Sequence, residues 1–286
     1  MLSKSSFCLY SPPLSSITSY MEMVDLAASY GIHQLETLNI LDLSTPDKAF
    51  ARKLRAYAEE KGITFPCVSA GINLVGEDHR EAVETAKAYI DIAAILGSPY
   101  FHHTIALEYS NPQLIADNFD LFYERGLAAV RQLYDYAQAL GIRTIYEDQG
   151  FLFNGVENFS RFLREVDRNV GIVADFGNIQ FVDQQVEDFI GAFHDRIVHV
   201  HVKDYRVTPG SSRNREVGEY LTKGGNYLLD CLVGKGSVHT EEAFQALQAM
   251  GYHGPVSLEC SPIGPDEEAG FRSNLAIING YIQQYL

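Results

Sequence analysis

The sequence lacks several features that would place it in a common class of protein. It has no uninterrupted run of about 20 apolar residues, the length that a membrane-spanning helix needs. Its first residues, MLSKSSFCLYSPP, lack the apolar core of a secretory signal. It has only four cysteines, and none of them forms a CxxC pair. We therefore expect reduced thiols in a cytoplasmic protein, rather than a disulfide framework or a cysteine-based zinc site.

Positive charge is also scarce. The chain has 22 Lys and Arg residues against 37 Asp and Glu residues, a formal net charge of −15. This balance argues against nucleic acid and against an anionic membrane surface as partners, because both are bound by basic side chains. The negative charge does not exclude a small-molecule substrate. Even a phosphorylated substrate would need only a local cationic site. We also expect the chain to form a homodimer or a homotetramer.

The nucleotide and serine-hydrolase motifs are missing as well. No GxGxxG follows a strand-like run, and neither GxxxxGK[ST] nor GxSxG occurs. Dinucleotide-binding, P-loop and serine-hydrolase functions therefore have no support in the sequence.

The sequence does contain a regular alternation of β-rich runs and helical patterns, which predicts βαβ units and a parallel sheet. Five helical patterns end at a glycine, which suits the left-handed position after a helix; these are Gly31, Gly62, Gly97, Gly141 and Gly251. The predicted strands are Phe7–Tyr10, His33–Thr37, Ile63–Ala70, Tyr100–His103, Arg143–Glu147, Val170–Ala174, Ile197–Lys203 and Val256–Glu259. Eight such units predict an α/β fold, a (β/α)8 TIM barrel. Because no Gly/Ser-rich or Pro-rich linker divides the chain, we expect residues 1–286 to form a single domain.

One segment interrupts this pattern. Residues 204–237 are too many for an ordinary connection after a strand, and they contain Pro209 and the Gly224–Gly225 pair. A long loop that follows a barrel strand lies on the active face and is often functional. We expect this loop to form part of the active-site wall and to order or shift when a ligand binds.

Four of the predicted strands end on a potential metal ligand: Glu147, Asp175, His201 and Glu259. In a parallel barrel the carboxyl ends of all strands lie at one mouth, so these side chains converge. Three converging carboxylates repel one another and are costly to bury, and a divalent cation relieves both effects. Taken singly, each acidic residue is explained equally well as a helix N-cap or a solvated loop residue. Four of them on four strands are much harder to explain by chance.

The identity of the imidazole ligand stays open, because His199 and His201 lie on the same face of their strand. We favour His201, which is nearer the mouth. Three oxygen ligands and one nitrogen suit Mn²⁺, Mg²⁺ or Co²⁺, and Zn²⁺ also accepts them. We therefore expect one divalent ion per chain, with Mn²⁺ favoured.

Three further residues are candidates for substrate contacts. Lys203 lies on the same side of its strand as His201, and can donate to a substrate oxygen or phosphate, or form an ion pair with Asp148. The fourth strand ends in two histidines, of which we expect His103 to hydrogen-bond the substrate. Glu36 ends the second strand and can bind a hydroxyl group or a cation, although a loop-capping role is equally plausible.

The ordered motifs YEDQG (146–150), DFGN (175–178), HVKD (201–204) and SLE (257–259) resemble those of the xylose isomerase-like barrel superfamily. Within it, the chain is most similar to the sugar phosphate isomerase/epimerase group, which includes ketose 3-epimerases and inosose-type isomerases and dehydratases. The resemblance covers essentially the whole chain, and its motifs are specific for the superfamily but weak for the substrate. It implies that Glu147, Asp175, His201 and Glu259 bind the metal, and that Glu147 and Glu259 exchange protons with the substrate.

The sequence departs from this family at one position. Where the family often has a histidine, three residues after the metal-binding aspartate, this chain has Asn178, which we expect to contact the substrate. The resemblance extends to endonuclease IV, whose several metal ions need many more histidines. The missing histidine and the negative charge together argue against a nuclease.

The leading hypothesis is therefore a metal-dependent isomerase or epimerase that acts on a keto-sugar, a sugar phosphate or a related polyol through an enediolate. One alternative is a metal-dependent dehydratase of a keto-sugar or keto-inositol, in which the enediolate expels a β-hydroxyl group and Lys203 or His103 serves as the acid. Another is a non-catalytic sugar-binding barrel, although a degenerate site would be expected to have lost a ligand.

Overall fold

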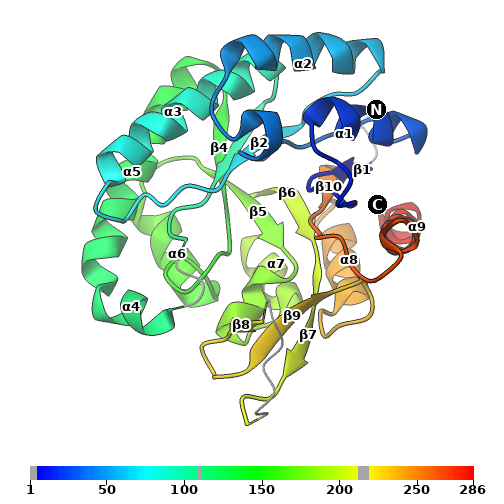
Figure 1. The fold of residues 1–286 in the computed structure, drawn as a ribbon. Helices are drawn as coiled ribbons and strands as arrows, with labels where there is room; N and C mark the ends of the chain where they lie inside the picture. The colour runs from blue at the N-terminus through cyan, green and yellow to red at the C-terminus, as the bar shows by residue number, and fades with distance from the viewer. Residues whose placement is uncertain (1–4, 108–110, 212–218) are drawn as a thin grey trace.

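Seven parallel strands form a curled sheet in the centre of the computed structural model, which describes residues 5–107, 111–211 and 219–286 (Figure 1). Their order is β1-β10-β6-β5-β4-β3-β2. The bounds are β1 Ser6–Leu9, β2 Cys67–Ala70, β3 Tyr100–His103, β4 Arg143–Glu147, β5 Gly171–Asp175, β6 Ile197–Val202 and β10 Pro255–Leu258. Each lies where a strand was predicted, and β2 is shorter than the predicted Ile63–Ala70.

The remaining predicted strand, His33–Thr37, forms isolated bridges rather than a continuous strand. Leu35 pairs with Leu9 of β1, and Thr37 pairs with Val68 of β2, both in the parallel sense. The amide of Glu36 donates to the carbonyl oxygen of Leu9 at 2.8 Å. This segment therefore occupies the eighth position, between the two edges of the seven-stranded sheet, and completes the predicted TIM barrel.

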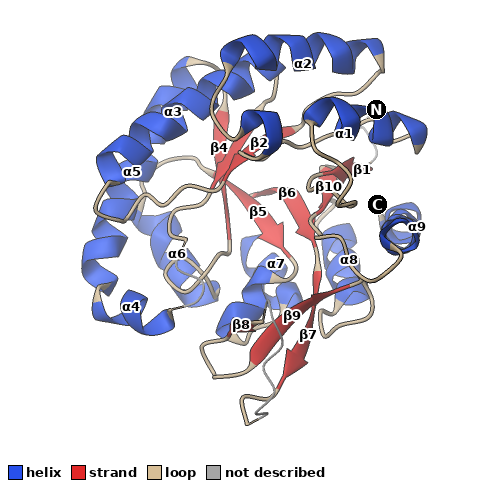
Figure 2. Cartoon of the chain, viewed as in Figure 1, coloured by secondary structure: helices blue, strands red, loops and turns tan. Residues whose placement is uncertain are grey.

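Helices surround the sheet, as the red and blue elements of Figure 2 show. Their bounds are α1 Tyr20–Ser29, α2 Lys48–Glu60, α3 His79–Leu96, α4 Pro112–Asp117, α5 Phe119–Ala139, α6 Val156–Glu165, α7 Val186–Phe193, α8 Thr240–Ala249 and α9 Glu267–Tyr285, with short 3₁₀ helices η1 Leu41–Leu43 and η2 Asn178–Val182. The five glycines predicted to follow helices all have positive φ, between 68° and 75°. Among the described residues, no helix has the length and apolar content required to cross a bilayer.

The segment 204–237 is not the irregular loop that we expected. It contains a three-stranded antiparallel sheet in the order β7-β9-β8, formed by β7 Asp204–Thr208, β8 Tyr220–Leu221 and β9 Tyr227–Cys231. Gly225 has φ of 85° in the turn between β8 and β9, so these glycines form a hairpin turn rather than a flexible stretch. Figure 1 shows this sheet projecting beyond the end of β6. Residues 212–218 of the predicted loop lie outside the described residues.

Two aspartates, the buried Asp204 and the exposed Asp183, hold this small sheet in place. Asp204 accepts hydrogen bonds from the amides of Gly234 at 3.0 Å and Gly236 at 2.9 Å. Asp183, which follows η2, accepts from the amide of Gly224 at 2.6 Å and from the hydroxyl of Thr222 at 2.9 Å. Hydrogen bonds to charged acceptors are among the stronger ones in proteins. These bonds hold the described part of the segment in a defined arrangement, and the expected shift on ligand binding stays a prediction.

The packing around the first residue of β5 generates a stability prediction. A Cβ atom on Gly171 would lie 2.7 Å from Cγ2 of Ile145 and 2.9 Å from Cγ2 of Val198. We expect Gly171→Ala to destabilise the fold by about 1–3 kcal/mol, the usual cost of overpacking. Gly191 in α7 has no atom within 4 Å of an added Cβ. Gly191→Ala should therefore raise stability by up to about 1 kcal/mol, because alanine favours the helix. Urea denaturation midpoints compare the two variants, and equal midpoints would contradict the packing argument.

Candidate metal centre at the barrel mouth

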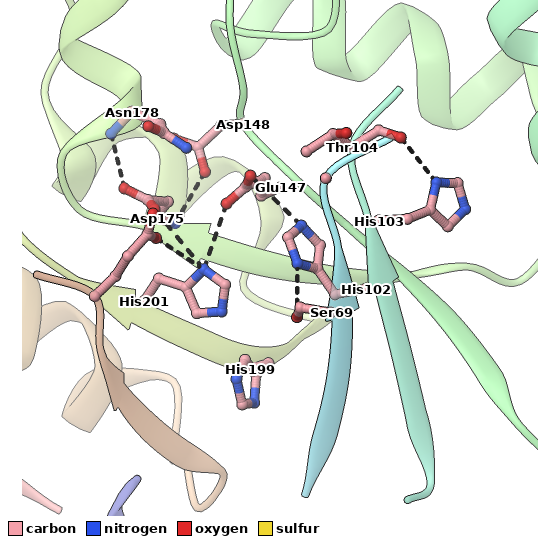
Figure 3. Close-up of polar contacts among 12 residues, drawn as sticks. Ser69, His102, His103, Thr104, Glu147, Asp148, Asp175, Asn178, His199 and His201 are labelled. Atoms are coloured by element: carbon pink, nitrogen blue, oxygen red, sulfur yellow. Dashed lines mark hydrogen bonds and ion pairs between the residues drawn. The ribbon is translucent and has the colours of Figure 1, made fainter. Parts of the chain in front are cut away.

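Four side chains from adjacent strand ends meet at one point of the barrel mouth, and Figure 3 shows three of them, Glu147, Asp175 and His201. Glu147 ends β4, Asp175 ends β5, His201 lies on β6 and Glu259 follows β10. Each offers one ligand atom, and all four atoms lie within 4.8 Å of one another. Nδ1 of His201 lies 3.4 Å from Oε2 of Glu147, 3.4 Å from Oε2 of Glu259 and 3.8 Å from Oδ2 of Asp175. The predicted convergence of these four residues is therefore present in the structure.

The other ring nitrogen of His201 contacts Glu36. Nε2 of His201 lies 3.1 Å from Oε1 of Glu36, and the ring stacks on Tyr10 with centroids 4.7 Å apart. If Nε2–H donates a hydrogen bond to the carboxylate of Glu36, the lone pair of Nδ1 faces the three mouth carboxylates. A histidine that binds a metal usually has its second nitrogen fixed in this way. Glu36 and Tyr10 thus hold the imidazole in the orientation that a ligand needs.

Glu36 lies beneath the four-residue group rather than beside the substrate. It is fully buried, and each of its oxygens faces two potential donors. Oε1 accepts from the hydroxyl of Ser69 at 2.5 Å, and Oε2 accepts from Ser257 at 2.6 Å and contacts Nε2 of His199 at 2.7 Å. Burial raises the pKa of Glu36, but His201 and His199 outweigh burial and hold the pKa well below its usual range. The structure therefore places Glu36 out of reach of a substrate at the mouth.

His199, the alternative imidazole ligand, lies one layer deeper in the barrel. Its contacts are Glu36 and Ser257, the latter at 3.1 Å from Nε2. It belongs to a different potential ligand group, with Glu36 and Cys67. The geometry therefore favours His201 at the mouth.

Asp175 uses its two oxygens differently. Oδ1 accepts hydrogen bonds from the amides of Gly177 and Asn178, both at 2.8 Å, and so caps the turn that leads into η2. Its own amide donates to Oδ1 of Asp148 at 2.9 Å. Oδ2 remains directed toward His201 and Lys203. The capping role and the potential ligand role, which the sequence presented as alternatives, therefore coexist on one side chain.

Lys203 is paired with two of the mouth carboxylates. Its Nζ lies 3.0 Å from Oδ2 of Asp175 and 3.1 Å from Oε1 of Glu259. Asp148, the partner considered from the sequence, instead accepts the amide of Asp175. Burial lowers the pKa of Lys203, but Asp175 and Glu259 raise it well above its usual value, so the ammonium group stays protonated.

His102, rather than His103, faces the group. Its Nε2 lies 3.5 Å from Oε1 of Glu147, and its Nδ1 contacts Ser69 at 3.0 Å. His103 points away (Figure 3), with Nε2 at 2.9 Å from the hydroxyl of Tyr146. Burial lowers the pKa of His103 to about 3, so its ring is neutral. The alternation of side chains along β3 could have predicted this outcome. His103 lies on the same side of the strand as the apolar Phe101, which packs toward the helices.

Asn178 follows Asp175 but makes its contacts through the backbone. Besides the amide bond to Asp175, its carbonyl oxygen accepts from Nδ2 of Asn154 at 2.7 Å. Within the described residues, the buried Nδ2 of Asn178 has no hydrogen-bond partner. The structure leaves this amide group available, and a substrate contact by Asn178 stays a prediction.

The donor set fits one divalent cation. Burial first, and then Glu259 and Glu147, raise the pKa of Asp175 to about 7. Burial also raises the pKa of Glu259, but Lys203 and His201 bring it down to about 2. Among the described residues, neither the buried Nδ1 of His201 nor the buried Oε2 of Glu147 has a hydrogen-bond partner of good geometry. A cation would satisfy both atoms and relieve the repulsion between the carboxylates.

A cavity of about 170 Å³ adjoins this group. Lys203 and Glu259 form its inner side, and the β7-β9-β8 sheet contributes much of the remaining wall. The described lining residues are Ser11, Lys203, Asp204, Tyr205, Tyr220, Asp230, Cys231, Glu259, Cys260, Ser261 and Ile263. The expected participation of the segment 204–237 in the wall of this cavity is therefore seen.

Comparison with known proteins identifies similar chains. A family model described as a xylose isomerase-like TIM barrel matches residues 24–280. An inosose dehydratase of Geobacillus thermodenitrificans (strain NG80-2) is 26% identical over 147 residues, which cover 50% of this chain and 47% of that protein. The chain thus matches about half the length of this curated relative.

Two solved structures share the fold over nearly the whole chain. An L-ribulose 3-epimerase aligns with a TM-score of 0.74 and 15% identity, covering 98% of this chain and 95% of the other. A xylose isomerase-like TIM barrel protein from Mycobacterium smegmatis, in complex with magnesium, aligns with a TM-score of 0.70 and 17% identity. The alignment covers 93% of this chain and 89% of the other.

The convergence of four ligands predicts the metal content. Purified protein dialysed against Mn²⁺ and then against buffer should retain about one ion per chain, as one four-ligand site implies. Asp175→Ala should lose most of it, while Asp195→Ala, an exposed residue at the other end of β6, should not. Elemental analysis measures both. Full metal content in Asp175→Ala would remove Asp175 from the site.

The contact beneath His201 gives a second prediction. Glu36→Gln replaces the carboxylate that contacts Nε2 with an uncharged amide of the same size. The ring of His201 should therefore be held less firmly, and its Nδ1 should be less basic. We expect the Kd for Mn²⁺, measured by calorimetry, to rise about 10–100-fold. Thermal unfolding without metal serves as the control for folding, and an unchanged Kd in a folded variant would contradict the role of Glu36.

Proposed function

The chain belongs to the xylose isomerase-like TIM barrel family, and from this premise we propose that it is a metal-dependent isomerase or epimerase of a keto-sugar, a sugar phosphate or a related polyol. The observation that carries the proposal is the placement of two glutamates around one imidazole. Glu147 and Glu259 each lie 3.4 Å from Nδ1 of His201. The fold shared with an L-ribulose 3-epimerase supports the same reaction class.

Glu147, Asp175, His201 and Glu259 would hold the ion, with Mn²⁺ favoured over Mg²⁺, Co²⁺ and Zn²⁺. When bound, a divalent cation supplies Lewis-acid stabilisation of the negative charge that develops on the substrate oxygens. The magnesium complex of a protein with the same fold supports such an ion here.

The two glutamates would move the protons. In the sheet order β10-β6-β5-β4, Glu259 and Glu147 come from positions on either side of β6 and β5. One carboxylate can therefore take a proton from the carbon beside the carbonyl on one face, and the other can return a proton on the opposite face. Proton removal gives an enediolate intermediate, and the proton returned to the same carbon on the opposite face gives the inverted centre. Lys203, held protonated beside Glu259, can donate a hydrogen bond to a substrate oxygen.

A dehydratase is the second candidate, because the curated relative that matches half of this chain is an inosose dehydratase. The same proton removal would then be followed by loss of a β-hydroxyl group as water. Lys203 is the better placed acid, because it adjoins Glu259 and lines the cavity. His103, the other acid considered, points toward Tyr146 instead.

Solvent exchange distinguishes these reactions. In D₂O with Mn²⁺ and a panel of ketoses and inososes, an epimerase incorporates deuterium at the carbon beside the carbonyl, which NMR detects. A dehydratase produces an enone, which absorbs in the ultraviolet. The absence of both signals with every compound that binds would contradict the proposed activity and favour a sugar-binding barrel.

If each glutamate moves a proton on its own face of the substrate, replacing one or the other should affect the two substrate epimers differently. Glu147→Gln and Glu259→Gln keep the size of the side chain but remove the base, so turnover should fall by about 10²–10⁴-fold while some metal stays bound. Each variant should lose deuterium wash-out from one substrate epimer more than from the other. If both variants lose exchange equally from both epimers, with metal still bound, a single base serves both faces.

A further inference from the structure

The cavity beside the metal centre contains a carboxylate that the proposed chemistry does not use. Asp230 lies on β9, is half-buried and lines this cavity together with Lys203 and Glu259. No described residue donates a hydrogen bond to Asp230. A carboxylate that is partly withdrawn from water and left without a donor needs a partner from elsewhere.

The register of the small sheet directs this side chain toward the site. Asp230 pairs with Tyr205 across the antiparallel strands β9 and β7, and directly opposed residues share one face. Tyr205 faces the metal centre, because its ring and Cγ of Lys203 both lie within 3.0 Å of where a Cβ on Gly177 would stand. Asp204, the neighbour of Tyr205, points to the other face and binds the amides of Gly234 and Gly236. Asp230 therefore faces the same space as Lys203.

The rest of the cavity suits an amphipathic, uncharged molecule. Tyr205 and Tyr220 contribute aromatic rings whose centroids lie 6.3 Å apart. The described lining has one ammonium group, Lys203, and that group already contacts Asp175 and Glu259. Asp230 and Glu259 add two carboxylates to the same lining. This excess of negative charge repels a phosphate group, whereas hydroxyl groups can donate to a carboxylate.

We propose that Asp230 is a substrate-binding residue, which accepts hydrogen bonds from a pair of adjacent hydroxyl groups on an uncharged sugar or polyol. The carbonyl end of the molecule then lies toward Glu259 and Lys203, and its carbon skeleton packs on Tyr205 and Tyr220. This assignment rests on the proposed function only in taking the cavity as the substrate site. It narrows the substrate to the unphosphorylated members of the class.

Binding of polyols tests the assignment separately from catalysis, because polyols have no carbonyl group and cannot turn over. Ribitol, D-glucitol, myo-inositol and D-glucitol 6-phosphate are titrated by calorimetry into the Mn²⁺-loaded protein. At least one uncharged polyol should bind, and more tightly than the phosphate. Asp230→Asn should raise its Kd about 10–100-fold, as expected for a hydrogen bond to a charged acceptor. Asp230→Glu, which retains the charge, should recover part of the loss.

Asp195→Asn is the matched control, an exposed aspartate at the opposite end of the barrel, and it should leave the Kd unchanged. Equal affinity in wild type and Asp230→Asn would overturn the assignment. Preferential binding of the phosphate, or no binding of any polyol, would overturn it as well. If polyol binding depends on Asp230 while no ketose or inosose exchanges deuterium, the assignment stands and the proposed isomerase activity fails. For any ketose that does turn over, Asp230→Asn should raise KM more than it lowers kcat.

Discussion

The mutual repulsion of three crowded carboxylates, two of them buried, is the constraint on which this site depends. Glu147 and Asp175 are buried at the end of an apolar barrel, and the partly exposed Glu259 meets them there. The chain supplies two compensating groups, the ammonium of Lys203 and the imidazole of His201. A divalent cation would add the remaining positive charge. The same crowding that makes the site costly would therefore favour the binding of a cation.

A polar layer beneath the mouth fixes this arrangement. Glu36 collects donors from Ser69, Ser257, His199 and His201 on its two oxygens, and so removes freedom from the imidazole above it. A buried network of this kind is stabilising only when its members are satisfied. The layer thus fixes the orientation of a strand-end histidine, and Glu36 does so from a segment, residues 33–37, that contributes only isolated bridges to the sheet.

The β7-β9-β8 sheet gives the barrel mouth an asymmetric wall. Asp183 accepts a hydrogen bond from the amide of Gly224 in this sheet, and Asp204, on β7, accepts one from the amide of Gly234. Tyr205 and Asp230 of this sheet line the cavity together with Lys203 and Glu259 of the barrel. The barrel and the insertion therefore both contribute side chains to the cavity wall.

The sequence by itself determined the barrel and the convergence of its four strand-end residues. Alternating β and helical patterns predict parallel units, and in a parallel barrel every strand must end at the same mouth. Glu147, Asp175 and Glu259 could therefore be found without coordinates, together with two candidate histidines, His199 and His201, of which the sequence favoured the second. Only the tertiary structure decided what the neighbouring polar residues contact. Glu36 lies under His201, and His102 takes the inward position expected for His103, because the pleat of each strand sets which side chain enters the barrel. The pairing of Tyr205 with Asp230 joins residues 25 positions apart through a register that no local pattern specifies.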